Sequence, residues 1–231
     1  MGFIFKQLKD ELSSTYTYIF GDSKTSEVAI VDSVLENVEI YLSLLKSHDW
    51  NLKYLIETHT HADHVTAIMN LKKHYPFSEV LLSKNSEAKY KVTRVKDKEI
   101  KLIGQHQFQI FETPGHTNDC ISIFIDGSRL LTGDCLFIGS CGRTDFQFGN
   151  NKDMYESINR IANLNSDVLI YPGHDYNNRF VSTVQEEKIN NKMLKLKNFE
   201  DFEREIKSWN LPPPKKIKEA VPANLMGGVL D

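Results

Sequence analysis

The sequence contains only three cysteines, no excess of basic residues and no long apolar run, and each shortage excludes a class of protein. An odd number of cysteines without the spacing of a disulfide framework fits a reducing compartment. Lysine and arginine number 28 against 31 acidic residues, so we expect no nucleic-acid partner. No run approaches the roughly 18 apolar residues of a membrane span, and we expect no membrane partner either.

The opening residues do not resemble a targeting segment. The apolar run of a signal peptide is missing, and Asp10 and Glu11 are acids that a transit peptide avoids. We therefore expect a cytoplasmic protein that acts on a small molecule. At 231 residues, with 40% hydrophobic and 26% charged residues, the chain is expected to fold as one domain over residues 1–231.

Strand and helix patterns alternate along the chain, which predicts the α/β class. Strands are expected near residues 3–8, 15–20, 27–31, 53–57, 79–82, 98–103, 107–113, 119–125, 129–132 and 167–171. Helices are expected near residues 34–47, 65–75 and 152–163. A helical segment is predicted over about 181–208, with an interruption near Asn198. The prolines at 212–214 predict an extended tail over about 210–231, because proline cannot continue a helix.

The densest group of metal-binding residue types is His59-x-His61-x-Asp63-His64, at the boundary of an expected strand and helix. His59 and His61 alternate, so their side chains point to the same side of an extended segment. Asp63 and His64 are expected in the first turn of the helix. Such clusters indicate a metal site.

Three more metal-competent residues lie at the ends of later strands or in the turns that follow them: His116, Asp134 and His174. In layered α/β folds this rim is where sites are built, because the strands are rigid and the loops vary. We expect all seven residues to form one site. Their types alone leave open whether they hold one metal ion or two.

The order of these seven residues resembles the pattern of the metallo-β-lactamase superfamily. The resemblance implies an αββα sandwich of two mixed β-sheets flanked by helices. Within the superfamily, the sequence resembles the persulfide dioxygenases, also called sulfur dioxygenases, which are related to glyoxalase II. The stretches that carry this second resemblance are residues 113–117, 139–147, 171–176, 181–187 and 221–225.

The persulfide dioxygenase resemblance implies one Fe(II) per chain, held by His59, His116 and Asp134. Such a set leaves positions open on ferrous iron for substrate and dioxygen. It also implies supporting roles, or a second metal site, for four residues: His61, Asp63, His64 and His174. Two zinc ions in place of one iron would instead suit a hydrolase.

The implied reaction is the oxidation of glutathione persulfide with O₂ and water to sulfite and glutathione. Arg143 offers a guanidinium fork for one carboxylate of glutathione, although an ion pair with Asp145 is the alternative. Tyr176 is a candidate phenolic donor. Cys141 lies in a glycine-rich loop near the expected site, and a packed thiol is the favoured interpretation.

Two other functions are open. One is a hydroxyacylglutathione hydrolase of glyoxalase II type with a dinuclear metal centre, and the other is a metal-binding protein without turnover. Residues 143–147 favour the dioxygenase, whereas Asn191-Lys192-Met193 departs from the Asn-Pro-Arg type of sequence expected there. We expect a homodimer or another homo-oligomer, and a separate rhodanese is a candidate partner.

Overall fold

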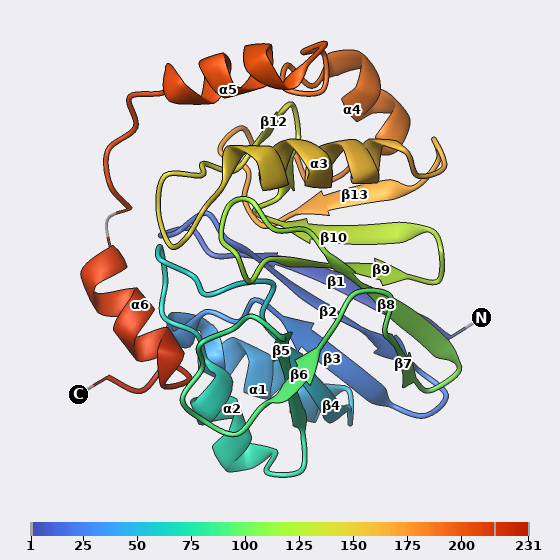
Figure 1. Ribbon diagram of the computed structural model, residues 1–231. Coiled ribbons are helices and arrows are strands. Elements are labelled where there is room, and N and C mark those ends of the chain that lie inside the picture. The colour runs from blue at the N-terminus through green and yellow to red at the C-terminus, as the bar shows by residue number, and fades with distance from the viewer. Residues whose placement is uncertain (1, 215, 231) are drawn as a thin grey trace.

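The computed structural model describes residues 2–214 and 216–230. Two six-stranded sheets face each other, and helices cover the outer face of each sheet (Figure 1). Both sheets combine parallel and antiparallel pairs. The predicted αββα sandwich of two mixed sheets is therefore confirmed.

The first sheet holds strands β1 to β6 in sequence order. Its strands are β1 Phe3–Lys9, β2 Tyr16–Asp22, β3 Glu27–Val31, β4 Asn51–Ile56, β5 Glu79–Ser83 and β6 Thr93–Val95. The short helix η1 and the helices α1 and α2 accompany this sheet, with bounds Leu35–Asn37, Val38–Ser47 and Ile68–His74. Buried side chains of α1 and α2, including Tyr41 and Leu71, pack on its outer face against Ile30 and Leu55.

The second sheet has the order β14-β13-β10-β9-β8-β7. Its strands are β7 Ile100–Ile103, β8 His106–Glu112, β9 Ile121–Ile125, β10 Arg129–Gly133, β13 Leu169–Pro172 and β14 Ser182–Thr183. A two-stranded ribbon, β11 Leu136–Phe137 and β12 Ser140–Cys141, lies beyond β10. Helices α3 Asn151–Ala162, α4 Val184–Asn190 and α5 Phe199–Lys207 cover the outer face, where Met154 and Phe202 pack against Ile170.

The main core lies between the two sheets. Phe108 of β8 meets Phe20 and Tyr54 of the first sheet edge-on, with ring centroids 5.3 and 5.6 Å apart. These aromatic pairs join the two layers and favour the observed alignment of the sheets. Among the residues that the structure describes, no helix is long and apolar enough to cross a membrane.

Local sequence signals explain several boundaries. Asp126 and Gly127 adopt positive φ angles of 46° and 65° in the turn between β9 and β10, as an Asp-Gly pair favours in a two-stranded hairpin. The side chain of Asn150 accepts hydrogen bonds from the N–H groups of Lys152 and Asp153 and so caps α3.

The predicted start of the second helix was wrong. α2 begins at Ile68, later than predicted, and Asp63 and His64 lie in an irregular loop. The N–H of Thr66 donates to the side chain of Asn224 at 2.8 Å instead of joining a helix. A distant partner therefore keeps this part of the chain in a loop.

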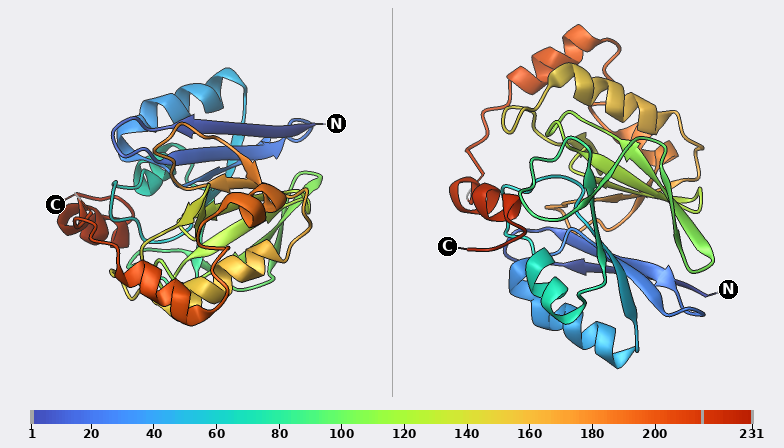
Figure 2. Two further views of the ribbon diagram at one scale, coloured as in Figure 1. Left: turned by 90° about the horizontal axis from the view of Figure 1, so that it is seen from above. Right: turned by 60° about the horizontal axis from the view of Figure 1, so that its bottom comes forward.

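The prediction of a fully extended tail over 210–231 was also wrong. Helix α6 spans Ile217–Leu225 and lies apart from the other helices, at the edge where the two halves of the sandwich meet (Figure 2). The prolines at 212–214 all precede α6, and only Pro222 lies inside it. Buried contacts of α6, such as those of Asn224, outweigh the cost of that one proline. Two tail residues lie outside the described part: Lys215 and Asp231.

Candidate metal centre

The predicted metal residues come from four connections that meet at one rim of the sandwich. β4 leads into residues 57–67, β8 into residues 113–120, β10 into Asp134 and β13 into His174. Rigid strands therefore position side chains that are far apart in the sequence. The structure brings all seven predicted residues to this rim.

Three of the seven form a compact group: His59, His116 and Asp134. Their ligand atoms all lie within 4.8 Å of one another. Asp134 Oδ2 is 3.5 Å from His116 Nε2 and 4.0 Å from His59 Nε2. Two atoms bonded to one ion at about 2.1 Å stand roughly 3.0 to 3.5 Å apart at bond angles of roughly 90° to 110°. The observed spacing is close to that of three ligands on one metal ion.

Hydrogen bonds at Nδ1 orient both imidazoles of this group. His116 Nδ1 donates to the carbonyl of Arg143 at 2.7 Å, and His59 Nδ1 lies 3.1 Å from the hydroxyl of Thr58. Nε2 of each ring is then the nitrogen directed at Asp134. Burial holds the pKa of His59 well below its usual value, so its ring is neutral and its lone pair is free for a metal.

The other four predicted residues surround this group. Asp63 Oδ2 lies 3.0 Å from His64 Nδ1 and 3.5 Å from His174 Nε2. His174 Nε2 is in turn 3.6 Å from Asp134 Oδ1. Within the described part of the chain, the buried atoms His64 Nε2 and Asp134 Oδ1 have no hydrogen-bond partner. Because orphaned buried polar atoms are rare, these two fit a site that holds an ion.

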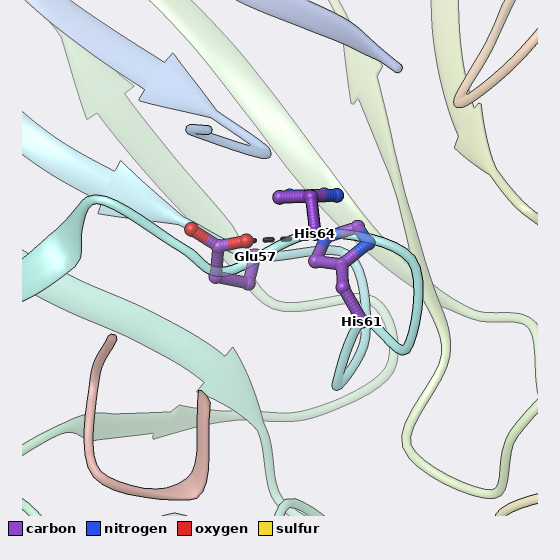
Figure 3. Close-up of side chains that lie close together, drawn as sticks. All are labelled: Glu57, His61 and His64. Atoms are coloured by element: carbon purple, nitrogen blue, oxygen red, sulfur yellow. Dashed lines mark ion pairs between the residues drawn. The ribbon is translucent and has the colours of Figure 1, made fainter. Parts of the chain in front are cut away.

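A second group with metal-binding geometry contains Glu57, His61 and His64 (Figure 3). His61 Nε2 lies 3.1 Å from Glu57 Oε2 and 3.1 Å from Asp32 Oδ1. Burial opposes a charge on His61, but the Asp32 carboxylate and then Glu57 outweigh burial and raise the pKa of His61 well above its usual value. Asp32 also accepts the N–H of Thr58 at 2.7 Å. These carboxylates anchor the loop that carries His59.

The sequence predicted no role at the metal site for Asp32, Glu57 or Asn224. The signal for the first two was present, because each is a carboxylate directly after a buried strand at the same rim. Asn224 gave no such signal. Its Nδ2 donates to the carbonyls of His61 and His64, at 2.9 Å each, from helix α6.

Gly173 leaves the space that the Asp134 carboxylate occupies. A Cβ at this position would lie 2.5 Å from Asp134 Oδ1 and 2.9 Å from the carbonyl carbon of Gly133.

We expect Gly173→Ala to displace the carboxylate and to weaken metal binding about tenfold, as seen when groups that orient a ligand are altered. Competition with a chelator measures this affinity. Gly127→Ala is the control, because it introduces a strained alanine at a φ of +65° in a remote turn where the Cβ touches nothing; equal metal affinities of the two variants would contradict the expectation.

A cavity of about 420 Å³ adjoins the metal residues. His116, Asp134 and His174 contribute to its lining. Much of the remaining wall is apolar and comes from Phe137, Ile138, Trp209, Leu211 and Pro214. A larger cavity of about 680 Å³ lies next to it but includes none of the seven metal residues, so we assign the substrate to the first cavity.

Arg143 lines this cavity, but its guanidinium is already engaged. Nε and Nη2 donate to the carboxylate of Asp145 at 2.7 and 2.8 Å, and Nη1 donates to the carbonyl of Pro212 at 2.6 Å. This is the ion pair that the sequence left open as the alternative, and a substrate-binding role of Arg143 stays a prediction. Tyr176 also lines the cavity, and its ring lies parallel to that of His174 with centroids 6.1 Å apart.

All three cysteines are free and buried, including Cys141, which contributes to the cavity wall. Burial raises the pKa of the Cys141 thiol, so the side chain stays protonated. The structure therefore favours the packed thiol over a reactive one.

Comparisons with known proteins agree with this geometry. Residues 10–174 match the family model of the Metallo-beta-lactamase superfamily. The human protein "Persulfide dioxygenase ETHE1, mitochondrial" is 38% identical over 228 residues, which cover 98% of this chain and 89% of the human one. The crystal structure of ETHE1 from Myxococcus xanthus is 41% identical, has a TM-score of 0.94, and the match covers 98% of this chain and 100% of that one. A probable hydroxyacylglutathione hydrolase of Schizosaccharomyces pombe is 34% identical over 167 residues, which cover 70% of this chain and 64% of the hydrolase.

The dioxygenase matches extend almost end to end, whereas the hydrolase match is shorter. The prediction of an oxidoreductase of the dioxygenase class is thereby confirmed, and the fold and the grouped ligands make this a metal-binding protein. The chain belongs to the metallo-beta-lactamase superfamily and, within it, to the persulfide dioxygenase family.

Proposed function

We propose that this chain oxidises glutathione persulfide with O₂ and water to sulfite and glutathione, using one Fe(II) per chain. The observation that carries the proposal is the compact group of His59, His116 and Asp134, whose ligand atoms lie within 4.8 Å of one another. Two histidines and one carboxylate on one face of ferrous iron leave positions open for substrate and dioxygen. The family match over 98% of the chain supports the same assignment.

The iron would supply the place where the persulfide sulfur and dioxygen react. Asp134 contributes the only negative charge among the three ligands, so a divalent ion held there would keep a net positive charge that attracts an anionic persulfide. The hydrogen bond from His116 to the carbonyl of Arg143 keeps the free nitrogen of that ring directed at the ion. Apolar cavity walls lie beside the place where the sulfur would react.

Counted from the protonated persulfide, one persulfide, one O₂ and one water yield one glutathione, one sulfite dianion and two protons; the first of these protons leaves when the persulfide ionises. The protons need acceptors close to the reacting atoms. Asp63 lines the cavity, and its carboxylate lies 3.0 Å from His64 Nδ1 and 3.5 Å from His174 Nε2. We propose that the protons leave through this part of the cavity, with the ionised Asp63 carboxylate holding the neighbouring rings in place for the transfer.

A hydroxyacylglutathione hydrolase with two metal ions is the second candidate. The contacts of Asp63 with His64 and His174, and of His174 with Asp134 at 3.6 Å, favour it because a second ion would need ligands placed in this way. Its relatives match a smaller part of the chain. A metal-binding protein without turnover is the least favoured candidate, because a cavity of substrate size adjoins the ligands.

The test follows dioxygen uptake by protein purified without oxygen, loaded with Fe(II) and supplied with glutathione persulfide. We expect one O₂ consumed and one sulfite formed for each persulfide, and no cleavage of a glutathione thioester. Thioester cleavage without dioxygen uptake would contradict the proposal and select the hydrolase. If the protein shows neither dioxygen uptake nor thioester cleavage, the metal-binding protein without turnover is the remaining candidate.

The proposal keeps three further expectations: a homo-oligomer, a separate rhodanese as partner, and a cytoplasmic location. The three buried free cysteines support a reducing compartment. A rhodanese fits because the chemistry requires a supply of sulfane sulfur on a low-molecular-weight thiol.

A further inference from the structure

Three cationic side chains line the cavity next to the metal residues: Arg143, Arg179 and Lys192. Glutathione carries two carboxylates, so the substrate of the proposed reaction needs at least one cationic partner in this cavity. The three candidates differ in how many of their donors are still free.

Arg143 has few donors left. Its Nε and Nη2 bind Asp145, and its outer edge is closed because Nη1 donates to the carbonyl of Pro212 at 2.6 Å and Nη2 to that of Leu211 at 3.3 Å. A guanidinium has five N–H donors, and four of those of Arg143 are in use. Arg143 therefore holds the segment around Leu211 at the cavity wall.

Arg179 is arranged differently. Its Nε and Nη2 both donate to one oxygen, Oδ1 of Asp175, at 3.1 and 2.9 Å. Asp175 is buried, and its other oxygen accepts the N–H groups of Asn177 and Arg179 at 2.8 and 2.7 Å. The guanidinium is thus held from one side by Asp175, while 43% of the side chain remains exposed.

The outer edge of this guanidinium is open. Among residues 2–214 and 216–230, Arg179 Nη1 has no hydrogen-bond partner, and Nη2 uses one of its two N–H groups. Nη1 lies 3.3 Å from the position that a Cβ would take at Gly139, where φ is +82°. The missing side chain at Gly139 leaves the room that Nη1 occupies. The parallel N–H groups of Nη1 and Nη2 match both oxygens of a carboxylate.

Lys192 offers a second and looser cation. Its Nζ lies 3.7 Å from Glu205 and 5.2 Å from the ring centre of Trp209, and 57% of the side chain is exposed. A flexible ammonium held in this way can turn toward a ligand without losing a buried contact.

We propose that Arg179, rather than Arg143, binds a carboxylate of the thiol that carries the persulfide, and that Lys192 assists at the second carboxylate. The inference rests on the proposed function for the identity of the substrate. It gives Arg143 the role of a positioning residue for the cavity wall.

The test compares glutathione persulfide with the persulfide of glutathione diethyl ester, in which both carboxylates are masked. For Arg179→Gln we expect KM for glutathione persulfide to rise about tenfold, with a smaller change in kcat, because one charge-assisted bidentate contact is lost. For the ester we expect the variant and the wild type to differ by less than about twofold. Arg179→Lys keeps a positive charge beside Asp175, and its KM for glutathione persulfide should lie between those of the wild type and Arg179→Gln. This variant shows how much of the change in Arg179→Gln comes only from leaving Asp175 without a cationic partner.

Arg204→Gln is the matched control, because Arg204 is an exposed arginine of α5 that pairs with Asp201 and does not line the cavity. An unchanged KM in Arg179→Gln, or an equal rise with the ester, would overturn the inference. The dissociation constant of glutathione itself separates this inference from the proposed function. If the protein oxidises no persulfide but Arg179→Gln still binds glutathione more weakly than the wild type, the proposed function is wrong and the carboxylate site is supported. If Arg179→Gln binds glutathione as tightly as the wild type, the carboxylate site is wrong, whether or not the protein oxidises persulfides.

Discussion

Asp134→Ala is expected to abolish dioxygen uptake and to leave the purified protein almost free of iron. Asp134 supplies the single carboxylate of the three-residue group and lies 3.5 Å from His116 Nε2 and 4.0 Å from His59 Nε2. Two neutral imidazoles bind a divalent ion much more weakly, so we expect the affinity to fall by more than about 100-fold. The iron content per chain and the initial rate of dioxygen uptake measure the effect.

His64→Ala is the comparison variant for this experiment. His64 is as deeply buried as its neighbours in the loop, but it contacts Asp63 at 3.0 Å and does not belong to the three-residue group. We expect most of the iron to remain, with a rate lower by up to about tenfold. Equal loss of metal in both variants would contradict the mononuclear assignment and favour a dinuclear site. Circular dichroism confirms that both variants are folded.

Asn224→Ala is expected to loosen the loop that carries the metal residues. Asn224 satisfies three buried backbone groups of this loop: the carbonyls of His61 and His64 at 2.9 Å each, and the N–H of Thr66 at 2.8 Å. Each group left without a partner costs about 1 to 3 kcal/mol. We therefore expect the free energy of unfolding to fall by about 3 kcal/mol and iron binding to weaken by about tenfold or more. Urea unfolding and chelator competition measure the two effects.

The control for this variant is Asn190→Ala. Asn190 is exposed in the last turn of α4, so its loss should change the free energy of unfolding by less than about 0.5 kcal/mol. If Asn224→Ala binds iron as tightly as Asn190→Ala does, the support of the loop by helix α6 is not needed for metal binding, and this part of the account fails.

The core of the site was predictable because its residues follow strands. The sequence shows where strands end, and the carboxyl ends of neighbouring strands place their next residues at a common rim. His116, Asp134 and His174 were expected there on this ground. The structure places each of them next to the His59 loop, with Asp134 Oδ2 4.0 Å from His59 Nε2, His174 Nε2 3.5 Å from Asp63 Oδ2, and the ring centroids of His116 and His59 4.9 Å apart. The αββα sandwich was predictable because the order of these residues resembles the metallo-β-lactamase pattern, and that resemblance implies the fold.

The supporting contacts were not predictable from the sequence, because they join segments that are distant along the chain. Asn224 lies about 160 positions from the loop it stabilises, and nothing in its own surroundings indicates that partner. The prolines at 212–214 led to an extended tail, although helix α6 begins only after them. Arg143 was expected to face the substrate, but its donors bind Asp145 and the carbonyls of the tail.

The metal content of the wild-type chain tests the central claim most directly. Protein purified without oxygen and equilibrated with excess Fe(II) is freed of loosely bound metal and analysed for iron per chain. The three-residue group formed by His59, His116 and Asp134 predicts one iron per chain. Two tightly bound metal ions per chain would contradict the account.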